Sequence, residues 1–398
     1  MADAPWLTIV GIGEDAPDGL PPASRAALER AEIVMGAPRH LRLLPPLAAE
    51  RSEWPVPFAG GIARLLSLRG RHVAVLVSGD PFWFGAGTSI ARHLSLDEWV
   101  ALPGASTFSL VAARMGWPLE LAGCFGLHAA PLARLRPALA TGARLIVLLR
   151  DGAAVHALAE YLAQAGFGGS TLSIFQSVGG PRERRTDGTA ADLPDTAFAH
   201  PVCAAVAVSG GEALPLASGR PDSWFDSDGQ MTKRPIRALT LSALAPRPFE
   251  HLWDIGGGSG SIGIEWLLSH PTLHATVFEP RADRAARIAE NAARLGVDRL
   301  HIVQGAAPDA LTDLPPPDTV FIGGGLTAAL LDWLGAHLRA GTRIVVNAVT
   351  LESEVLLTQA QARHGGDLMR IELAQAAPLG QGRGWKARYP VVQWSTVL

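Results

Sequence analysis

The sequence is poor in cysteine and contains no long apolar run. Its two cysteines, Cys124 and Cys203, lie far apart and outside any Cys-x-x-Cys or His-paired spacing. This pattern argues against a disulfide framework and against a zinc site, so no metal is expected. Apolar runs such as residues 145–149 are much shorter than the roughly 20 residues of a membrane-spanning helix. No basic segment followed by a long apolar stretch opens the chain, so a signal peptide is not predicted. These absences predict a cytoplasmic protein without a membrane partner.

Charge is also scarce, and lysine is almost missing. Charged residues make up 18% of the chain and hydrophobic residues 48%, so most of the chain can bury a core. The net charge is −3 and no dense basic run occurs, which argues against a nucleic-acid partner. Lys233 and Lys386 are the only lysines, and the other basic residues are arginines. Arginine forks suit carboxylate-rich ligands, although codon bias would produce the same composition.

With 398 residues the chain is long for one core, and it contains two successive α/β series. In the first series, short apolar strands alternate with helices, which indicates a mostly parallel sheet covered by helices. The expected strands are 7–10, 73–77 and 145–149, and the expected helices are 85–94, 106–115 and 153–165. Residues 218–229 are polar and rich in turn residues. We therefore predict domains at 1–218 and 231–398 with a linker at 219–230, so that a chain beginning near Asp222 should fold alone.

The second series predicts a doubly wound, Rossmann-like sheet. Its expected strands are 252–255, 275–278, 301–303, 319–322 and 343–347, followed by tail strands at 368–375 and 390–395. Its expected helices are 235–244, 283–295, 327–338 and 353–362. The fold class expected for the whole chain is therefore α/β, with two domains in succession.

A glycine-rich turn after the first of these strands predicts a nucleoside site. Residues 253–263 are a strand end, a glycine-rich turn and a helix start, and Glu279 closes the next strand, where it can accept hydrogen bonds from ribose hydroxyls. A dinucleotide pattern, GxGxxG, can be placed on residues 258–263, so NAD is an alternative. Asp254 argues against NAD, because a carboxylate at the turn suits an amino group and a sulfonium better than a pyrophosphate. S-adenosylmethionine is therefore the expected cofactor.

From residue 230 to 394 the chain resembles the class I methyltransferase domain of precorrin C15-methylating, decarboxylating enzymes. The matching motifs are residues 231–239, 254–263, 320–325, 347–352 and 378–380. The resemblance implies a cofactor site at Asp254, Gly256, Gly258, Ser259, Gly260, Glu279, Gly305 and Ala306. Ala306 departs from the family, which often has an acid there. The candidates for holding substrate and steering protons are Thr232, Lys233, Asn347, Thr350 and Glu352; structural support is the alternative role for each.

Three glycine-containing turns follow expected strands of the first series, at residues 11–13, 78–81 and 103–107, which suggests a ligand cleft at the carboxyl edge of its sheet. From about residue 7 to 216 the chain resembles the class III tetrapyrrole methyltransferases of the precorrin C5-methylating type, a two-lobed domain. The cofactor residues implied are Gly11, Gly79, Asp80, Ser106 and Thr107. Glu14 departs from the family, in which proline is usual, and His128 matches it.

The two domain types in this order are similar to the family of precorrin-6Y C5,15-methyltransferases (decarboxylating). The resemblance implies methylation of a tetrapyrrole at C5 and C15, loss of the ring C acetate carboxyl group, and a homo-oligomer, with a tetramer favoured. Two alternatives remain open. One is a class I enzyme acting on protein or RNA, with the front domain as a recognition module. The other is a binder in which one adenosylmethionine site has decayed.

Overall fold

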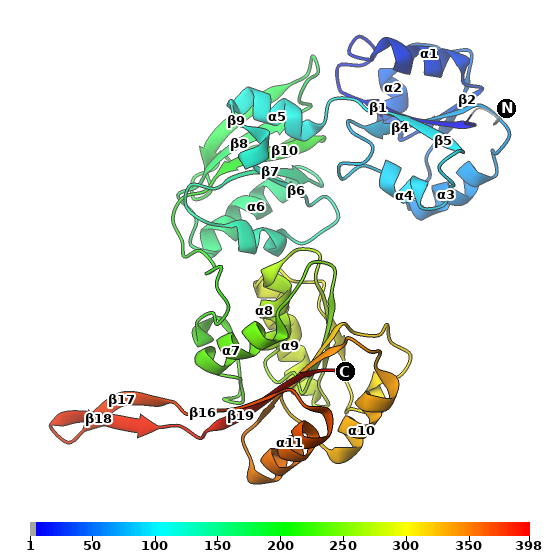
Figure 1. Ribbon diagram of the computed structural model, residues 1–398. Coiled ribbons are helices and arrows are strands. Elements are labelled where there is room, and N and C mark those ends of the chain that lie inside the picture. The colour runs from blue at the N-terminus through cyan, green and yellow to red at the C-terminus, as the bar shows by residue number, and fades with distance from the viewer. Residues whose placement is uncertain (1–4) are drawn as a thin grey trace. The chain divides into compact units, whose positions relative to one another are not determined.

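The computed structural model describes residues 5–398, which divide into two units (Figure 1). Unit 1 contains the described residues up to Leu132 together with Ala138–Glu212. Unit 2 contains Ala133–Pro137 and Ala213–Leu398. Within residues 5–398, no helix combines the length and the apolar composition needed to cross a membrane.

The first lobe of unit 1 is a parallel sheet with helices on both faces (Figure 1). Its strand order is β3-β2-β4-β1-β5, with β1 Leu7–Ile12, β2 Ile33–Gly36, β3 Glu50–Glu53, β4 Val73–Ser78 and β5 Trp99–Leu102. Helices α1 Pro22–Arg30 and α2 Pro38–Leu43 cover one face, and α3 Ala59–Leu66 and α4 Gly87–Ala91 cover the other. Alternate residues of β1 enter opposite cores, which explains its unbroken apolar run.

The second lobe of unit 1 has a mixed sheet in the order β6-β7-β10-β8-β9. Its strands are β6 Gly123–Gly126, β7 Arg144–Leu149, β8 Thr171–Gln176, β9 Arg184–Thr189 and β10 Val202–Ala207, and its helices are α5 Thr107–Met115 and α6 Ala153–Gln164. Only β6 and β7 pair in parallel. The expected mostly parallel sheet is therefore wrong for this lobe. A short connection joins β8 directly to β9, and such a connection permits an antiparallel pair but no helical crossover.

Unit 2 is a doubly wound sheet in the order β13-β12-β11-β14-β15-β19-β16. The parallel strands are β11 His251–Ile255, β12 His274–Phe278, β13 His301–Val303, β14 Thr319–Ile322 and β15 Arg343–Ala348. Helices α7 Arg234–Leu244, α8 Ser261–Ser269 and α9 Ala282–Arg294 pack on one face. Helices α10 Ala328–His337 and α11 Leu351–His364 pack on the other. The predicted two-lobed domain followed by a Rossmann-like domain is confirmed.

The C-terminal tail differs from its prediction as two simple strands. It forms β16 Asp367–Ile371, then the hairpin β17 Ala374–Leu379 and β18 Gly382–Ala387, and finally β19 Val391–Val397. The hairpin extends from unit 2 as a two-stranded arm (Figure 1). The helix expected at residues 85–94 is shorter, since α4 covers only Gly87–Ala91. Short 3₁₀ helices lie at Leu119–Leu121, Leu132–Ala138, Asp222–Trp224 and Asp309–Leu311.

The segment predicted as a linker, residues 219–230, lies within unit 2 in the structure. Arg220 and Phe225 are buried, with 3% and 5% of their surface exposed. The backbone N–H groups of Gly219 and Arg220 donate to the carboxylate of Glu265 on α8. Phe225 packs in the apolar core and these polar contacts hold the rest of the segment, a combination that produces no hydrophobic periodicity in the sequence.

Candidate functional sites

Unit 2 has a cavity of about 1360 Å³ at the carboxyl ends of its parallel strands. It is lined by the segments that follow four neighbouring strands: the turn after β11, Glu279 after β12, residues 305–307 after β13 and residues 323–325 after β14. The chain winds in opposite directions from β11, with β12 on one side and β14 on the other. Such a reversal of strand order is where doubly wound sheets bind ligands.

Backbone meets backbone at the floor of this cavity. Gly256 has a φ of +76°, and a Cβ there would lie 2.7 Å from the nitrogen of Gly324. A Cβ on Gly257 would lie 2.1 Å from a methyl carbon of Val277. Only glycine fits these positions, so the turn exposes main chain to a ligand without intervening side chains.

Two buried carboxylates line the cavity. Asp254 is 1% exposed, and its Oδ2 accepts from the Gly263 nitrogen at 2.9 Å. Burial and, to a smaller degree, the charge of Glu279 raise the pKa of Asp254 to about 7, although the hydrogen bond from Gly263 lowers it. Glu279 is 2% exposed and accepts from the nitrogens of Gly258 at 2.8 Å and Arg281 at 3.1 Å. Across residues 5–398, no basic side chain forms an ion pair with either acid.

This lining fits S-adenosylmethionine. A cationic ligand would supply the positive charge that the two acids lack, and Glu279 retains lone pairs for ribose hydroxyls. Ser259 is 2% exposed and lines the cavity, and its hydroxyl has no hydrogen-bond partner within the described chain. An unpartnered buried hydroxyl at a cavity wall is a group that a polar ligand can satisfy.

The cavity brings together most of the residues predicted for unit 2. Those that line it are Thr232, Lys233, Asp254, Gly256, Gly258, Ser259, Glu279, Gly305, Ala306 and Asn347. Gly260 is not among the lining residues; it caps α8, and a Cβ there would meet Ile288.

Two candidates, Thr350 and Glu352, are not brought to the cavity. Thr350 is exposed and caps α11, where its hydroxyl accepts from the Ser353 nitrogen at 3.3 Å. Glu352 is exposed in the first turn of α11, where a negative charge favours the helix dipole. Both positions have a structural explanation.

Sequence reasoning missed the residues that hold Asn347. The Asn347 Nδ2 donates to the hydroxyl of Thr240 at 2.8 Å, and its Oδ1 accepts from Gln393 at 2.9 Å. Gln393 is 3% exposed in β19. A single amide within the apolar run of residues 391–394 is the signal that could have identified it. Because the Thr240 hydroxyl donates to the carbonyl oxygen of Ile236, it is free to accept from the Asn347 Nδ2.

Unit 1 has a second cavity, of about 590 Å³, lined by residues of both lobes. Of the predicted cofactor residues, Gly79, Asp80, Ser106 and Thr107 line it. Ser106 caps α5, whose first residue is Thr107, so amides at the helix start lie beside the cavity. Gly11 lies behind the wall, and a Cβ there would be 2.0 Å from the carbonyl oxygen of Gly79.

The structure explains Glu14, the residue that departs from the family. Its carboxylate pairs with Arg39 of the first lobe and with Arg182 of the second at 3.1 Å. Glu14 is 7% exposed, and a Cβ on Gly180 would lie 2.5 Å from its carbonyl oxygen. The acid therefore connects the first loop to the second lobe.

His40 and two aromatic rings, which sequence reasoning did not single out, also line this cavity. Burial, with the neighbouring Arg39 charge, lowers the pKa of His40 to about 3, so this imidazole is neutral. Trp83 and Phe84 pack on Phe108, with ring centroids 4.9 and 5.7 Å apart. His128 lines the cavity as well. Among the described residues, no group of three His, Cys, Asp or Glu side chains is arranged to hold a metal ion.

Comparison with known proteins matches each half of the chain separately. The tetrapyrrole (corrin/porphyrin) methylases match residues 6–194, and the precorrin methyltransferase domain matches residues 223–398. A cobalt-precorrin-6B C(15)-methyltransferase (decarboxylating) of Salmonella typhimurium (strain LT2) is 35% identical over 167 residues, which cover 40% of this chain and 85% of that protein.

Two relatives match over nearly the full length. A precorrin-6Y C(5,15)-methyltransferase (decarboxylating) of Sinorhizobium sp is 46% identical over 98% of this chain and 96% of its own. Another, of Mycobacterium tuberculosis (strain CDC 1551), is 41% identical over 98% of this chain and 99% of its own. With this identity over both units, the chain belongs to the family of precorrin-6Y C(5,15)-methyltransferases (decarboxylating).

Proposed function

We propose that this chain methylates a precorrin at C5 and C15 with S-adenosylmethionine and removes the carboxyl group of the ring C acetate, in cobalamin biosynthesis. The observation that carries the proposal is a glycine-walled cavity in each unit of a chain that its relatives match from end to end. The proposed reaction takes place in the cytoplasm on a cobalt-free precorrin.

Unit 2 would carry out C15 methylation and decarboxylation, and unit 1 would carry out C5 methylation. Two observations support this division: separate family models match the two halves, and a relative named for the C15 reaction matches only 40% of this chain. On this proposal the catalytic domains correspond to units 1 and 2, and the second begins near residue 213 rather than 231.

The bound cofactor supplies an electrophilic methyl group, and the protein must align and desolvate the reactants. In unit 2, Asp254 and Glu279 would hold the cofactor's ammonium group and ribose hydroxyls. A meso carbon of a reduced tetrapyrrole reacts like an enamine carbon, so methyl transfer needs no strong base. Alignment and exclusion of water then provide most of the rate enhancement.

Decarboxylation also requires little from the protein except placement. The bond to the carboxylate breaks with its electron pair moving into the conjugated macrocycle, and a proton then converts the remaining carbon to a methyl group. Lys233, Arg234 and Arg388 line the cavity of unit 2, where they can pair with the carboxylates of the substrate. Asn347, oriented by Gln393, presents a fixed amide to the same space.

A homo-oligomer, with a tetramer favoured, is the proposed assembly. The hairpin β17–β18 and the residues beside it leave apolar side chains uncovered, with Leu379 71% exposed, Trp385 79% and Tyr389 89%. An uncovered arm of this composition gains stability when another subunit buries it. Light scattering at micromolar concentration should give a multiple of the 41.8 kDa chain mass, and a mass near that of one chain would refute the proposal.

The proposed activity is tested with the purified protein, adenosylmethionine and precorrin-6Y. We expect a product that has gained two methyl groups and lost one carboxyl group, together with released carbon dioxide. Calorimetry with adenosylhomocysteine should show two sites per chain. Uptake of one ligand per chain, with no change in the mass of the tetrapyrrole, would instead support the binder with a decayed site.

A further inference from the structure

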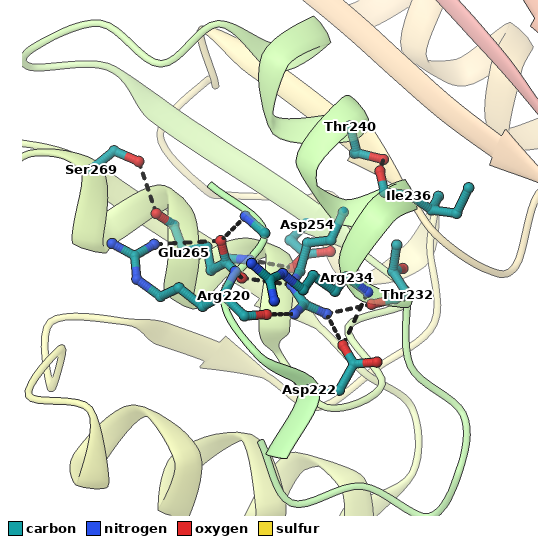
Figure 2. A network of polar contacts seen from close by, with 12 residues as sticks. Arg220, Asp222, Thr232, Arg234, Ile236, Thr240, Asp254, Glu265 and Ser269 are labelled. Carbon is teal, nitrogen blue, oxygen red and sulfur yellow. Dashed lines mark hydrogen bonds and ion pairs between the residues drawn. The ribbon is translucent and has the colours of Figure 1, made fainter. Parts of the chain in front are cut away.

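A buried arginine on α7 joins three segments of unit 2. Arg237 has no exposed surface, and its Nε donates to the Glu265 carboxylate at 2.6 Å. Its Nη1 donates to the carbonyl oxygen of Thr232 and, at 3.1 Å, to Asp222. Its Nη2 donates to the carbonyl oxygen of Arg220. The acceptors lie on α8, on the 3₁₀ turn at Asp222, and on the stretch before α7 (Figure 2).

Glu265 completes this network from inside the core. It has no exposed surface, and its oxygens accept from the backbone nitrogens of Gly219 at 2.7 Å and Arg220 at 2.9 Å. The Arg220 side chain also pairs with it, at 3.4 Å (Figure 2). A buried carboxylate of this kind is tolerated only with well-placed cationic and N–H partners. The positions of these partners around the Glu265 carboxylate are therefore closely defined.

Together with Met231, which packs against the apolar core, the network holds a wall of the cavity. The residues of this wall that line the cavity are Pro221, Asp222 and 230–234. None of residues 226–235 is fully buried. The Asp222 carboxylate accepts from the Arg234 nitrogen at 3.0 Å and so anchors the start of α7. Thr232 is held through its carbonyl oxygen, which leaves its side chain free at the wall.

We propose that Arg237 is a positioning residue for the reaction of unit 2: its guanidinium sets where Thr232 and Lys233 stand relative to the bound methyl donor. This inference rests on the proposed function. Arg237 uses four of its N–H hydrogens on four acceptors in a fixed plane. A lysine ammonium offers three donors from one point and cannot reach all four acceptors. Charge alone is therefore insufficient at this position.

The test compares Arg237→Lys with Leu357→Ala in the full-length chain. Leu357 is fully buried on α11 in the core of the opposite face, so its truncation destabilises unit 2 without touching the wall. We expect Arg237→Lys to lower the kcat of C15 methylation about 10- to 100-fold, since a small misplacement of reactants has effects of this size. The Kd of adenosylhomocysteine should change less than about threefold, because the Asp254 and Glu279 contacts remain. C5 methylation should be unchanged in the same molecules.

A second readout does not depend on activity. A lysine-specific protease can cut the wild-type chain only after Lys233, in the wall, and after Lys386, in the hairpin arm. In Arg237→Lys, cleavage after Lys233 should accelerate about tenfold relative to cleavage after Lys386, because a loosened segment opens more often. Mass spectrometry separates this cut from one at the introduced lysine. Leu357→Ala should leave the ratio unchanged.

The proposal is overturned if Arg237→Lys loses no more kcat than Leu357→Ala, or if the cleavage ratio stays at its wild-type value. If Arg237→Lys does not fold, Asp222→Asn decides, because its side chain is 36% exposed and the change keeps its size. An Asp222→Asn enzyme with wild-type kcat and cleavage ratio would overturn the proposal. A wild-type protein without C15 methylation would refute the proposed function instead, and the cleavage ratio would still report whether Arg237 holds the wall.

Discussion

The two units build similar cavities but surround their acids differently. In both, a glycine at the end of a parallel strand touches a glycine at the end of a neighbouring one: Gly11 meets Gly79, and Gly256 meets Gly324. Unit 2 places two acids there that have only backbone partners. In unit 1 two acids line the cavity: two arginines pair with Glu14, and Asp80 accepts from the backbone nitrogen of Phe82.

This difference indicates two ways to bind one cofactor. The methyl donor carries a sulfonium and an ammonium group, so unit 2 can recognise it by charge. Unit 1 offers backbone groups, a neutral His40, the aromatic rings of Trp83 and Phe84, and the carboxylate of Asp80. Because the pKa of Asp254 is raised, we expect cofactor affinity in unit 2 to change with pH through this acid, a dependence for which the described residues of the unit 1 cavity offer no counterpart buried to the same degree.

The largest expected effect concerns where unit 2 begins. A chain of residues 213–398 should fold, whereas one of residues 222–398 should lose roughly 3–5 kcal/mol of stability, because Glu265 then loses Arg220 and two N–H partners. Urea unfolding of the two truncated chains measures this difference. Equal midpoints would mean that residues 213–221 are dispensable, as the sequence pattern alone predicts.

Removing an acid from unit 2 should have the next largest effect. Glu279→Ala should weaken adenosylmethionine binding in unit 2 by roughly 1–3 kcal/mol, since the Gly258 nitrogen and the ribose both lose their acceptor. Calorimetry on the full-length chain measures it, and Glu14→Gln is the matched control in unit 1. If Glu279→Ala leaves affinity unchanged, the ribose assignment is wrong.

The pH dependence of cofactor binding distinguishes the units. The raised pKa of Asp254 means that the ligand-free folded protein keeps a proton that the unfolded chain loses above about pH 4. Stability of unit 2 should therefore fall as pH rises toward 7. A bound cation favours the ionised acid, so affinity should rise about tenfold between pH 6 and pH 8. Asp254→Asn should abolish this dependence, and a pH-independent wild-type Kd would contradict the assignment.

The smallest expected effect tests the role of Thr350. Thr350→Ala should cost about 1 kcal/mol of stability through loss of the α11 cap, with C15 methylation kept. Thr327→Ala, which removes the similar cap of α10, is the matched control. A loss of activity in Thr350→Ala that Thr327→Ala does not share would restore Thr350 as a catalytic candidate.

Strands buried on both faces could be predicted almost to the residue. The run at 319–322 coincides with β14, whose four residues are all buried, because an apolar run ended by turn residues is a complete local signal. The hairpin β17–β18 gave no such signal. Its residues are mostly exposed, so no alternation of apolar and polar side chains marks its strands.

The sites could be predicted where backbone geometry requires a residue type. Gly256 and Glu279 belong to a local strand–turn–helix pattern, and both line the cavity. Arg237 donates to Glu265, which is 28 residues away, and Gln393 donates to Asn347, which is 46 residues away. A single sequence does not show which distant residues form such pairs. The polar segment at 219–230 illustrates the same limit, because its partner is a buried acid on α8.

The hydrogen bond from Gly219 to Glu265 joins residues that are 46 positions apart, and its donor is synthesised before its acceptor. During translation, unit 1 is complete at residue 212 and can begin to fold as it emerges. The amides of Gly219 and Arg220 are synthesised 46 and 45 residues before their acceptor. A ribosome that stalls before α8 would therefore release a chain with a finished first unit and an unattached tail, in which neither the wall nor the glycine turn of unit 2 could form.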